Sequence, residues 1–92
     1  MKKPRKTPVS KQGFFQRFLI EKRLNAGFSQ KELAETLGWT SGQYVSNIER
    51  GLSAFPEDKM KRLSKVLKVP LPKLIRIMSR DYESALYERL KA

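Results

Sequence analysis

Cysteine and histidine are both missing from this chain of 92 residues. Their absence excludes disulfide bonds, thiolate nucleophiles, Cys/His zinc sites and imidazole acid–base catalysis. The sequence also lacks any run of about 18 apolar residues, so it predicts no membrane-spanning helix. Its few acidic residues fall at ordinary helix-surface positions, with no nucleophile–base pair among them. We therefore expect neither an enzyme nor a cofactor-binding protein.

Negative charge is scarce as well, because 20 Lys and Arg stand against nine Asp and Glu, a formal net charge of +11. Such an excess predicts a polyanionic partner and favours nucleic acid over an anionic membrane surface. Residues 1–12 contain no acidic residue and two prolines, so we expect this segment to be disordered on its own. We interpret it as an arm that contacts DNA phosphates or the minor groove, rather than only a solubilising tail.

The rest of the chain shows the apolar periodicity of helices, which predicts an all-α fold. Ser29 and Glu32 form a capping box at the start of one helix, and Gly38 suits the left-handed turn at its end. We place a domain over residues 13–78 and a C-terminal helical extension over residues 79–92. The expected helices cover residues 13–26, 29–38 and about 42–50, then 56 to about 68, and from Pro72 to nearly the end of the chain.

The expected helix at residues 42–50 has an unusual solvent face. At about 100° per residue, Gln43, Asn47 and Arg50 lie together, opposite the apolar Val45 and Ile48. Exposed helix positions are ordinarily filled by Glu and Lys. Gln and Asn can instead bond an adenine edge bidentately in the major groove, which is wide enough for a helix. The alternative is a surface helix that is polar and nothing more.

Three sequence motifs occur in order around this helix: Phe-Leu-x-x-Lys-Arg before Gly27, Ser-Gln-x-Glu-Leu-Ala-x-x-Leu-Gly, and Val-Ser-x-Ile-Glu-Arg-Gly. Together they resemble the Cro/repressor-like (Xre-type) helix-turn-helix family over about Phe14 to Met78. The resemblance implies a five-helix, lambda-repressor-like domain whose third helix enters the major groove of double-stranded DNA. To this domain we add the basic N-terminal arm and the C-terminal helical extension.

The resemblance also implies roles for individual residues. Gln30 bonds a phosphate and braces the third helix, Ala34 lets the second and third helices pack closely, and Arg23 pairs with Glu49. The DNA-base candidates are Gln43, Tyr44 and Asn47. The DNA-phosphate candidates are Gln30, Ser41, Ser46, Arg50, Lys2, Lys3, Arg5 and Lys6.

The sequence departs from the family pattern in three places. One extra residue occurs between Gly38 and Val45, which we expect to lengthen the corner without disturbing the third helix. Leu52 and Ala54 stand where relatives often carry basic residues. Pro70 stands where relatives often have a polar cap for the fifth helix.

An apolar stripe continues along the last expected helix. Leu71, Leu74, Ile75 and Met78 are expected to face inward, and the inner face of the third helix could extend to Leu52. Beyond Met78, three alternatives remain open: the helix folds back on the domain, pairs with a second subunit, or frays. The stripe there consists of Tyr82, Ala85, Leu86 and Leu90.

These observations favour a sequence-specific transcriptional regulator, cytoplasmic and of bacterial or phage type, which lies on the nucleoid when bound to DNA. One short helix reads few base pairs, so we expect a homodimer on a near-palindrome. Two alternatives stay open. The domain could serve as an antitoxin or interaction module with a protein partner at residues 79–92, or it could bind nucleic acid through charge alone.

Overall fold

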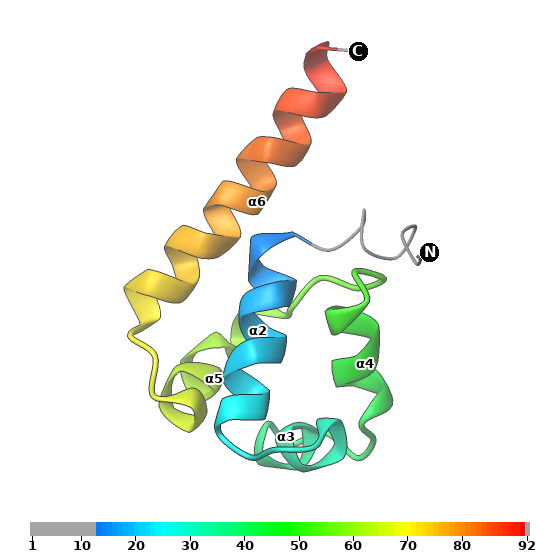
Figure 1. The fold of residues 1–92 in the computed structure, drawn as a ribbon, viewed down its shortest axis with the longest axis vertical. Helices are drawn as coiled ribbons and strands as arrows, with labels where there is room; N and C mark the ends of the chain where they lie inside the picture. Colours follow the sequence, from blue (N-terminus) through cyan, green and yellow to red (C-terminus); the bar gives the residue numbers. More distant parts are fainter. Residues whose placement is uncertain (1–12, 92) are drawn as a thin grey trace.

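The computed structural model describes residues 13–91, and over that range the chain is all-helical, as the sequence predicts. The expected arm at residues 1–12 lies outside the described residues. Helix α2 runs through the middle of the molecule, with α4 on one side, α5 and α6 on the other, and α3 across one end (Figure 1). The described elements are α2 (Phe14–Asn25), α3 (Gln30–Thr36), α4 (Gln43–Glu49), the 3-10 turn η1 (Glu57–Lys59), α5 (Met60–Leu67) and α6 (Leu71–Lys91).

Local signals in the sequence set the ends of α3 and α4. The hydroxyl of Ser29 accepts a hydrogen bond from the Glu32 backbone N–H at 3.0 Å, and the Glu32 carboxylate accepts one from the Ser29 N–H at 2.8 Å. Gly38 has φ 87° and Gly51 has φ 79°, both in the left-handed region that glycine enters without steric cost. The predicted capping box and the glycine stop after α3 are confirmed.

Three predictions about local packing are wrong. Pro56 precedes the 3-10 turn η1 and does not begin an α-helix, so α5 starts later than expected. The side chain of Leu52 is 62% exposed because the chain turns away from α4 at Gly51. Ile75 is 51% exposed, whereas its neighbour Leu74 is fully buried, because α2 and α5 cover the Leu74 side of α6.

A small core joins all of the helices. Phe15 from α2 packs against Phe55 with ring centroids 5.7 Å apart, which ties the loop after α4 to the centre of the molecule. Each fully buried aliphatic side chain contributes about 1.5–3 kcal/mol through the hydrophobic effect. The core therefore holds α3 and α4 in a fixed relation to α2. Its members are Phe15, Leu19, Leu33, Ala34, Leu37, Val45, Ile48, Phe55, Met60, Leu63, Leu67, Val69 and Leu74.

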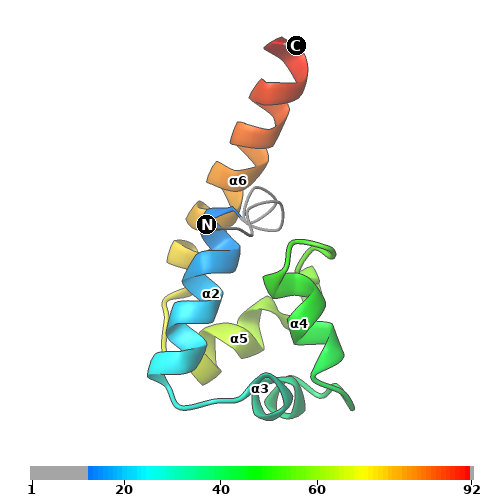
Figure 2. The same cartoon turned by 45° about the vertical axis from the view of Figure 1, so that its right-hand side comes forward.

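Helix α6 leaves the body of the domain without bending back. It is 21 residues long, which corresponds to about 30 Å at 1.5 Å per residue, and its second half extends past the other helices (Figures 1 and 2). Leu74 is the buried residue of this helix, and near its end Leu90 is 77% exposed. The fold-back alternative is thus wrong. Across the described helices, none combines the length and apolar character that crossing a membrane requires.

Candidate nucleic-acid interface

Helices α3 and α4 meet at a tight corner. In Figure 2, α3 is seen nearly end-on while α4 runs along the page, so their axes cross steeply. A Cβ atom on Gly42 would lie 2.9 Å from the backbone nitrogen and 3.0 Å from the Cα atom of Lys31. Glycine is therefore what lets the start of α4 touch the backbone of α3. The Ser41 hydroxyl, one residue before the N-cap Gly42, accepts a hydrogen bond from the Gln43 N–H at 3.0 Å and so contacts the first residue of α4.

Helix α4 is regular beyond the corner. The helix is continuous from Gln43 to Glu49, and Val45 and Ile48 are both buried on its inner side. Residues 39–42 form the loop between α3 and α4. Ser41 lies in this loop as an exposed residue at the start of α4.

The outer face of α4 carries a side-chain hydrogen-bond network. The Asn47 side-chain oxygen accepts one hydrogen bond from the Gln43 amide nitrogen at 2.9 Å and another from the Arg50 guanidinium at 3.0 Å. The three residues are spaced by one helical turn, which is why they meet. The network uses the Asn47 oxygen and leaves the Asn47 amide nitrogen and the Gln43 oxygen outside these two bonds. One donor group and one acceptor group are thus set side by side on an exposed helix.

Tyr44 lies at the border of this face and is held by an aromatic neighbour. Its ring stacks on Trp39 with centroids 5.3 Å apart and an interplanar angle of 28°. Trp39 in turn contacts Phe55 edge-on at 6.1 Å, and Phe55 is buried. A chain of rings therefore connects a 52% exposed tyrosine to the core. The sequence reasoning gave Trp39 no role, although an aromatic residue directly after the Gly38 helix stop is a signal that could have been used.

A buried ion pair fixes the C-terminal end of α4. Arg23 and Glu49 form two hydrogen bonds, Nε to Oε2 at 2.6 Å and Nη2 to Oε1 at 3.1 Å. Arg23 also donates to the Phe28 carbonyl at 2.9 Å, and the Gln30 amide donates to Glu49 Oε1 at 2.9 Å. Helices α2, α3 and α4 are joined through these four groups. Removing one charge from a buried pair typically costs about 3–5 kcal/mol, because the other is left without a counter-charge.

The structure places most of the candidate residues on or next to the α3–α4 corner. Gln30 begins α3 and is half-buried, with one N–H of its amide donated to Glu49. An amide nitrogen carries two hydrogens, so a second N–H remains for a phosphate. Gln43, Tyr44, Arg50 and Ser41 are exposed, and Ser46 and Asn47 are half-buried. Lys2, Lys3, Arg5 and Lys6 lie outside the described residues.

The chemistry of this face is that of hydrogen bonding, with amides, hydroxyls, a phenol and a guanidinium. Such groups contact base edges and phosphate oxygens of DNA. Among residues 13–91, no three His, Cys, Asp or Glu side chains gather as they would to hold a metal ion. The exposed face of α4 is thus suited to recognition.

A family model described as helix-turn-helix matches residues 19–74, which is more than half of the chain and includes α3, the corner and α4. The matched range ends at Leu74, so most of α6 lies beyond it. No curated protein matches this chain.

Proposed function

Because this chain belongs to the Xre/Cro-like helix-turn-helix family of DNA-binding domains, we propose that it regulates transcription by recognising a specific DNA sequence with α4. The observation that carries this proposal is the outer face of α4, where Gln43, Asn47 and Arg50 hold one another in place. An ordered set of amide groups on a rigid helix supports base recognition, since little side-chain freedom is lost on binding.

In this proposal the two amides contact base edges. Asn47 donates through its remaining amide N–H groups, and Gln43 accepts through its side-chain oxygen, a combination that fits an adenine edge in the major groove. Tyr44 contacts a neighbouring base from its position against Trp39. Phosphate contacts hold the register and come from residues around this face and from the arm. The residues proposed to make these phosphate contacts are Gln30, Ser41, Ser46, Arg50, Lys2, Lys3, Arg5 and Lys6.

We further propose a homodimer on a near-palindromic operator, because one seven-residue helix spans only a few base pairs. A protein of this kind acts in the compartment that holds the chromosome, the cytoplasm of a bacterium, where it lies on the nucleoid when bound. No acid–base pair or nucleophile contributes to this function, which is recognition without catalysis.

The first test is Gln43→Ala. Its affinity is measured by fluorescence anisotropy on an operator selected from a random duplex pool and on a scrambled duplex at the same salt concentration. We expect operator affinity to fall by about 1–3 kcal/mol, the usual contribution of a bidentate base contact, with little change on scrambled DNA. Asn25→Ala, which removes an exposed amide at the end of α2, is the matched control. Equal losses of affinity on both duplexes would mean that Gln43 contacts the DNA backbone, and would contradict base recognition.

A further inference from the structure

Helix α6 carries an apolar stripe that its own domain covers only in part, near the start of the helix, where Leu71 and Met78 pack against the core. Ile75, Tyr82 and Leu90 are each more than half exposed, although they lie on one side of the helix at intervals of seven and eight residues. Most of this helix lies outside the matched family range. Large exposed apolar surface on a small soluble domain is typical of an interaction site. The whole stripe consists of Leu71, Ile75, Met78, Tyr82, Leu86 and Leu90.

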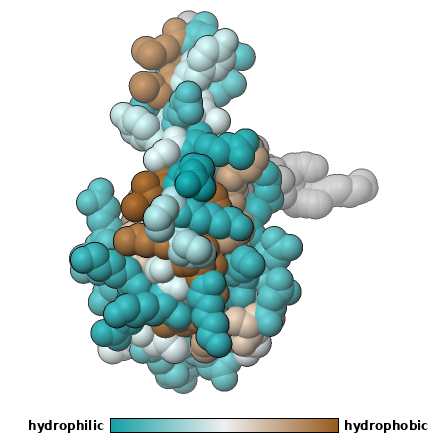
Figure 3. Space-filling model, turned by 90° about the vertical axis from the view of Figure 1, so that its left-hand side faces the viewer, coloured by the Kyte–Doolittle hydropathy of each residue, from teal (hydrophilic) through white to brown (hydrophobic). Residues whose placement is uncertain are grey.

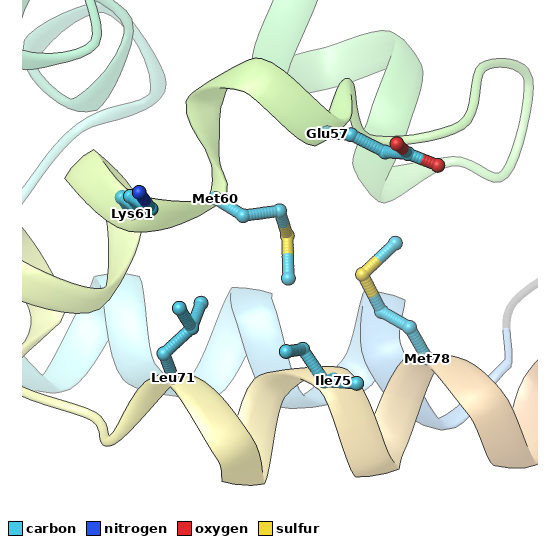
Figure 4. A pocket seen from close by; sticks show the side chains of 6 residues that line it. All are labelled: Glu57, Met60, Lys61, Leu71, Ile75 and Met78. Atoms are coloured by element: carbon cyan, nitrogen blue, oxygen red, sulfur yellow. The ribbon is translucent and has the colours of Figure 1, made fainter.

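The stripe begins in a groove between α5 and α6. The groove has a volume of about 400 Å³ and is lined mainly by apolar side chains. Met60 from α5 and Met78 from α6 point into it from opposite sides, and Leu71 and Ile75 form its floor on α6 (Figure 4). Figure 3 shows hydrophobic surface both on the body of the domain and near the far end of α6, each bordered by hydrophilic side chains. The groove thus contains the first residues of the stripe, Leu71, Ile75 and Met78.

The spacing of the stripe is self-complementary. When a second α6 runs antiparallel with its midpoint at about Arg80, the near half of one stripe meets the far half of the other. Leu71 then lies opposite Leu90 of the second copy, Ile75 opposite its Leu86, and Met78 opposite its Tyr82. The midpoint of each pair falls within one residue of Arg80. Three hydrophobic pairs thus share one two-fold axis and occur twice, which is the property of an isologous interface.

The charged residues at the edge of the stripe are related by the same two-fold axis. Arg76 and Glu83 are seven residues apart, so they lie on the same edge of the stripe, and both are exposed. Their midpoint also falls within one residue of Arg80. In the antiparallel pair each Arg76 therefore comes beside Glu83 of the second copy, as in the edge positions of paired helices. Opposite charges meet at both ends of the interface.

We propose that a second copy of this chain covers the stripe through antiparallel pairing of α6, with Leu86 and Leu90 of each copy seated at the α5–α6 groove of the other. The pairing gives the homodimer of the proposed function a defined interface. It needs no DNA, so it can be tested separately from base recognition.

The test is sedimentation velocity of the full chain without DNA, together with three charge variants. We expect the unaltered chain to dimerise. Arg76→Glu and Glu83→Arg each place like charges together and should raise the dimer dissociation constant by about tenfold or more, since like-charge pairs across an interface are strongly unfavourable. The double variant Arg76→Glu/Glu83→Arg restores both pairs and should restore the dimer. Ser84→Glu, on an exposed position away from the stripe, is the control and should change nothing.

Disulfide trapping tests the direction of pairing, because the chain has no cysteine of its own. Ser79→Cys lies next to the two-fold axis and should form a covalent dimer on oxidation. Ile75→Cys lies away from the axis, about 16 Å from its symmetry mate at 1.5 Å rise per residue, too far for a disulfide, whose Cα atoms are usually less than about 7 Å apart. Mixing Ile75→Cys with Leu86→Cys should give the cross-linked heterodimer.

Several results would overturn the proposal. If the chain stays monomeric at high micromolar concentration, the stripe is not covered by a second copy and would instead be a site for another protein. A dimer that ignores both charge reversals uses another surface, and efficient trapping of Ile75→Cys alone indicates parallel pairing. None of these results removes base recognition, since a monomer can still prefer one half-site over scrambled DNA. Loss of that preference with an intact dimer would instead contradict the proposed function and leave the α6 interface standing.

Discussion

Asn47 is the central residue of the exposed face of α4, because its side-chain oxygen accepts hydrogen bonds from the residues one turn before and one turn after it. The free oxygen of Gln43 and the free amide of Asn47 are therefore not independent groups. The position of each depends on the bond between them. This dependence is measurable as a coupling of their contributions to DNA binding.

We predict that Gln43→Ala and Asn47→Ala are not additive on operator DNA. Each change removes its own base contact and also releases the other side chain, so the double variant should lose less than the two single losses combined. Directly bonded residues typically show coupling of about 0.5–3 kcal/mol. The measurement is a double-mutant cycle of operator affinity, with Gln43→Ala and Asn25→Ala as the uncoupled control pair. Additive losses at Gln43 and Asn47 would mean that the network is not present when DNA binds.

Lys68 ends α5 in the left-handed conformation, with φ 57° and ψ 44°. A side chain in this region typically costs about 1–2 kcal/mol, and glycine avoids that cost. Lys68→Gly should therefore raise the free energy of unfolding by up to about 1 kcal/mol, after the larger entropy of an unfolded glycine is counted. Urea denaturation measures it. Lys65→Gly, inside α5, is the control and should lower stability by about 1 kcal/mol; equal destabilisation by both would contradict the account.

At the residue scale, side-chain contacts that depend on how the chain folds could not be predicted from the sequence. The grouping of Gln43, Asn47 and Arg50 follows from helical geometry alone, and the structure has them bonded to one another. The contact between Trp39 and Tyr44 could not be derived in the same way, since it depends on how the corner folds. The left-handed Lys68 carries no sequence signal either, because lysine has no preference for that conformation.

At the scale of helices, α6 does more than extend the chain. Its Asp81 carboxylate accepts hydrogen bonds from the backbone N–H groups of Phe14 at 2.7 Å and Phe15 at 2.8 Å, the first residues of α2. These N–H groups have no partner within their own helix. The guanidinium of Arg80 also lies 4.2 Å from the centre of the Phe14 ring. Helix α6 therefore caps α2, and the cap fixes the direction in which α6 leaves the domain.

We predict that Asp81→Ala lowers the free energy of unfolding by about 0.5–2 kcal/mol, the usual range for loss of an N-cap. Thermal or urea unfolding of the full chain measures it. Glu35→Ala removes an exposed carboxylate from α3 and should change stability by less than about 0.5 kcal/mol. Hydrogen exchange at Phe14 and Phe15 should also become faster in Asp81→Ala only. Unchanged exchange there would show that Asp81 does not cap α2 in solution.

The sequence predicts those elements whose signals lie within a few residues. Ser29, Glu32 and Gly38 define α3 locally, and the apolar period defines α2 and α6. The cap from Asp81 could not be predicted because it joins positions 67 residues apart. The start of α5 was misplaced for a related reason. Pro56 is compatible with both an α-helix and a 3-10 turn, and in the structure it precedes the 3-10 turn η1, so that α5 begins only at Met60.

On the scale of the whole molecule, the proposed function gives separate roles to the net charge of +11 and to the outer face of α4. Positive charge attracts every sequence alike and weakens with salt, whereas base contacts separate one sequence from another. The family and the all-α fold could be predicted from the sequence. The extent of α6 could also be predicted, since the expected helix from Pro72 to nearly the end of the chain is close to Leu71–Lys91. Its direction could not, because that depends on the contact between Asp81 and the start of α2.

We predict that Lys2→Gln combined with Lys3→Gln weakens binding to operator and scrambled DNA by the same factor. For every phosphate that the variant no longer neutralises, the slope of log K against log salt concentration should become shallower by about 0.9. Anisotropy titrations over a salt series measure both effects. Lys91→Gln, at the far end of α6, removes a lysine charge in the same way and should leave the slope nearly unchanged. A weakening confined to the operator would instead place the arm at specific bases.

The central claim is sequence-specific recognition by α4, and its most direct measurement is selection of binding sites from a random duplex pool at about physiological salt. The account predicts a compact enriched motif with two-fold symmetry, whose base preferences change at fixed positions when Gln43 or Asn47 is replaced by alanine. No enrichment, with affinity that collapses as salt rises, would mean that charge alone binds the DNA and would contradict the role of α4.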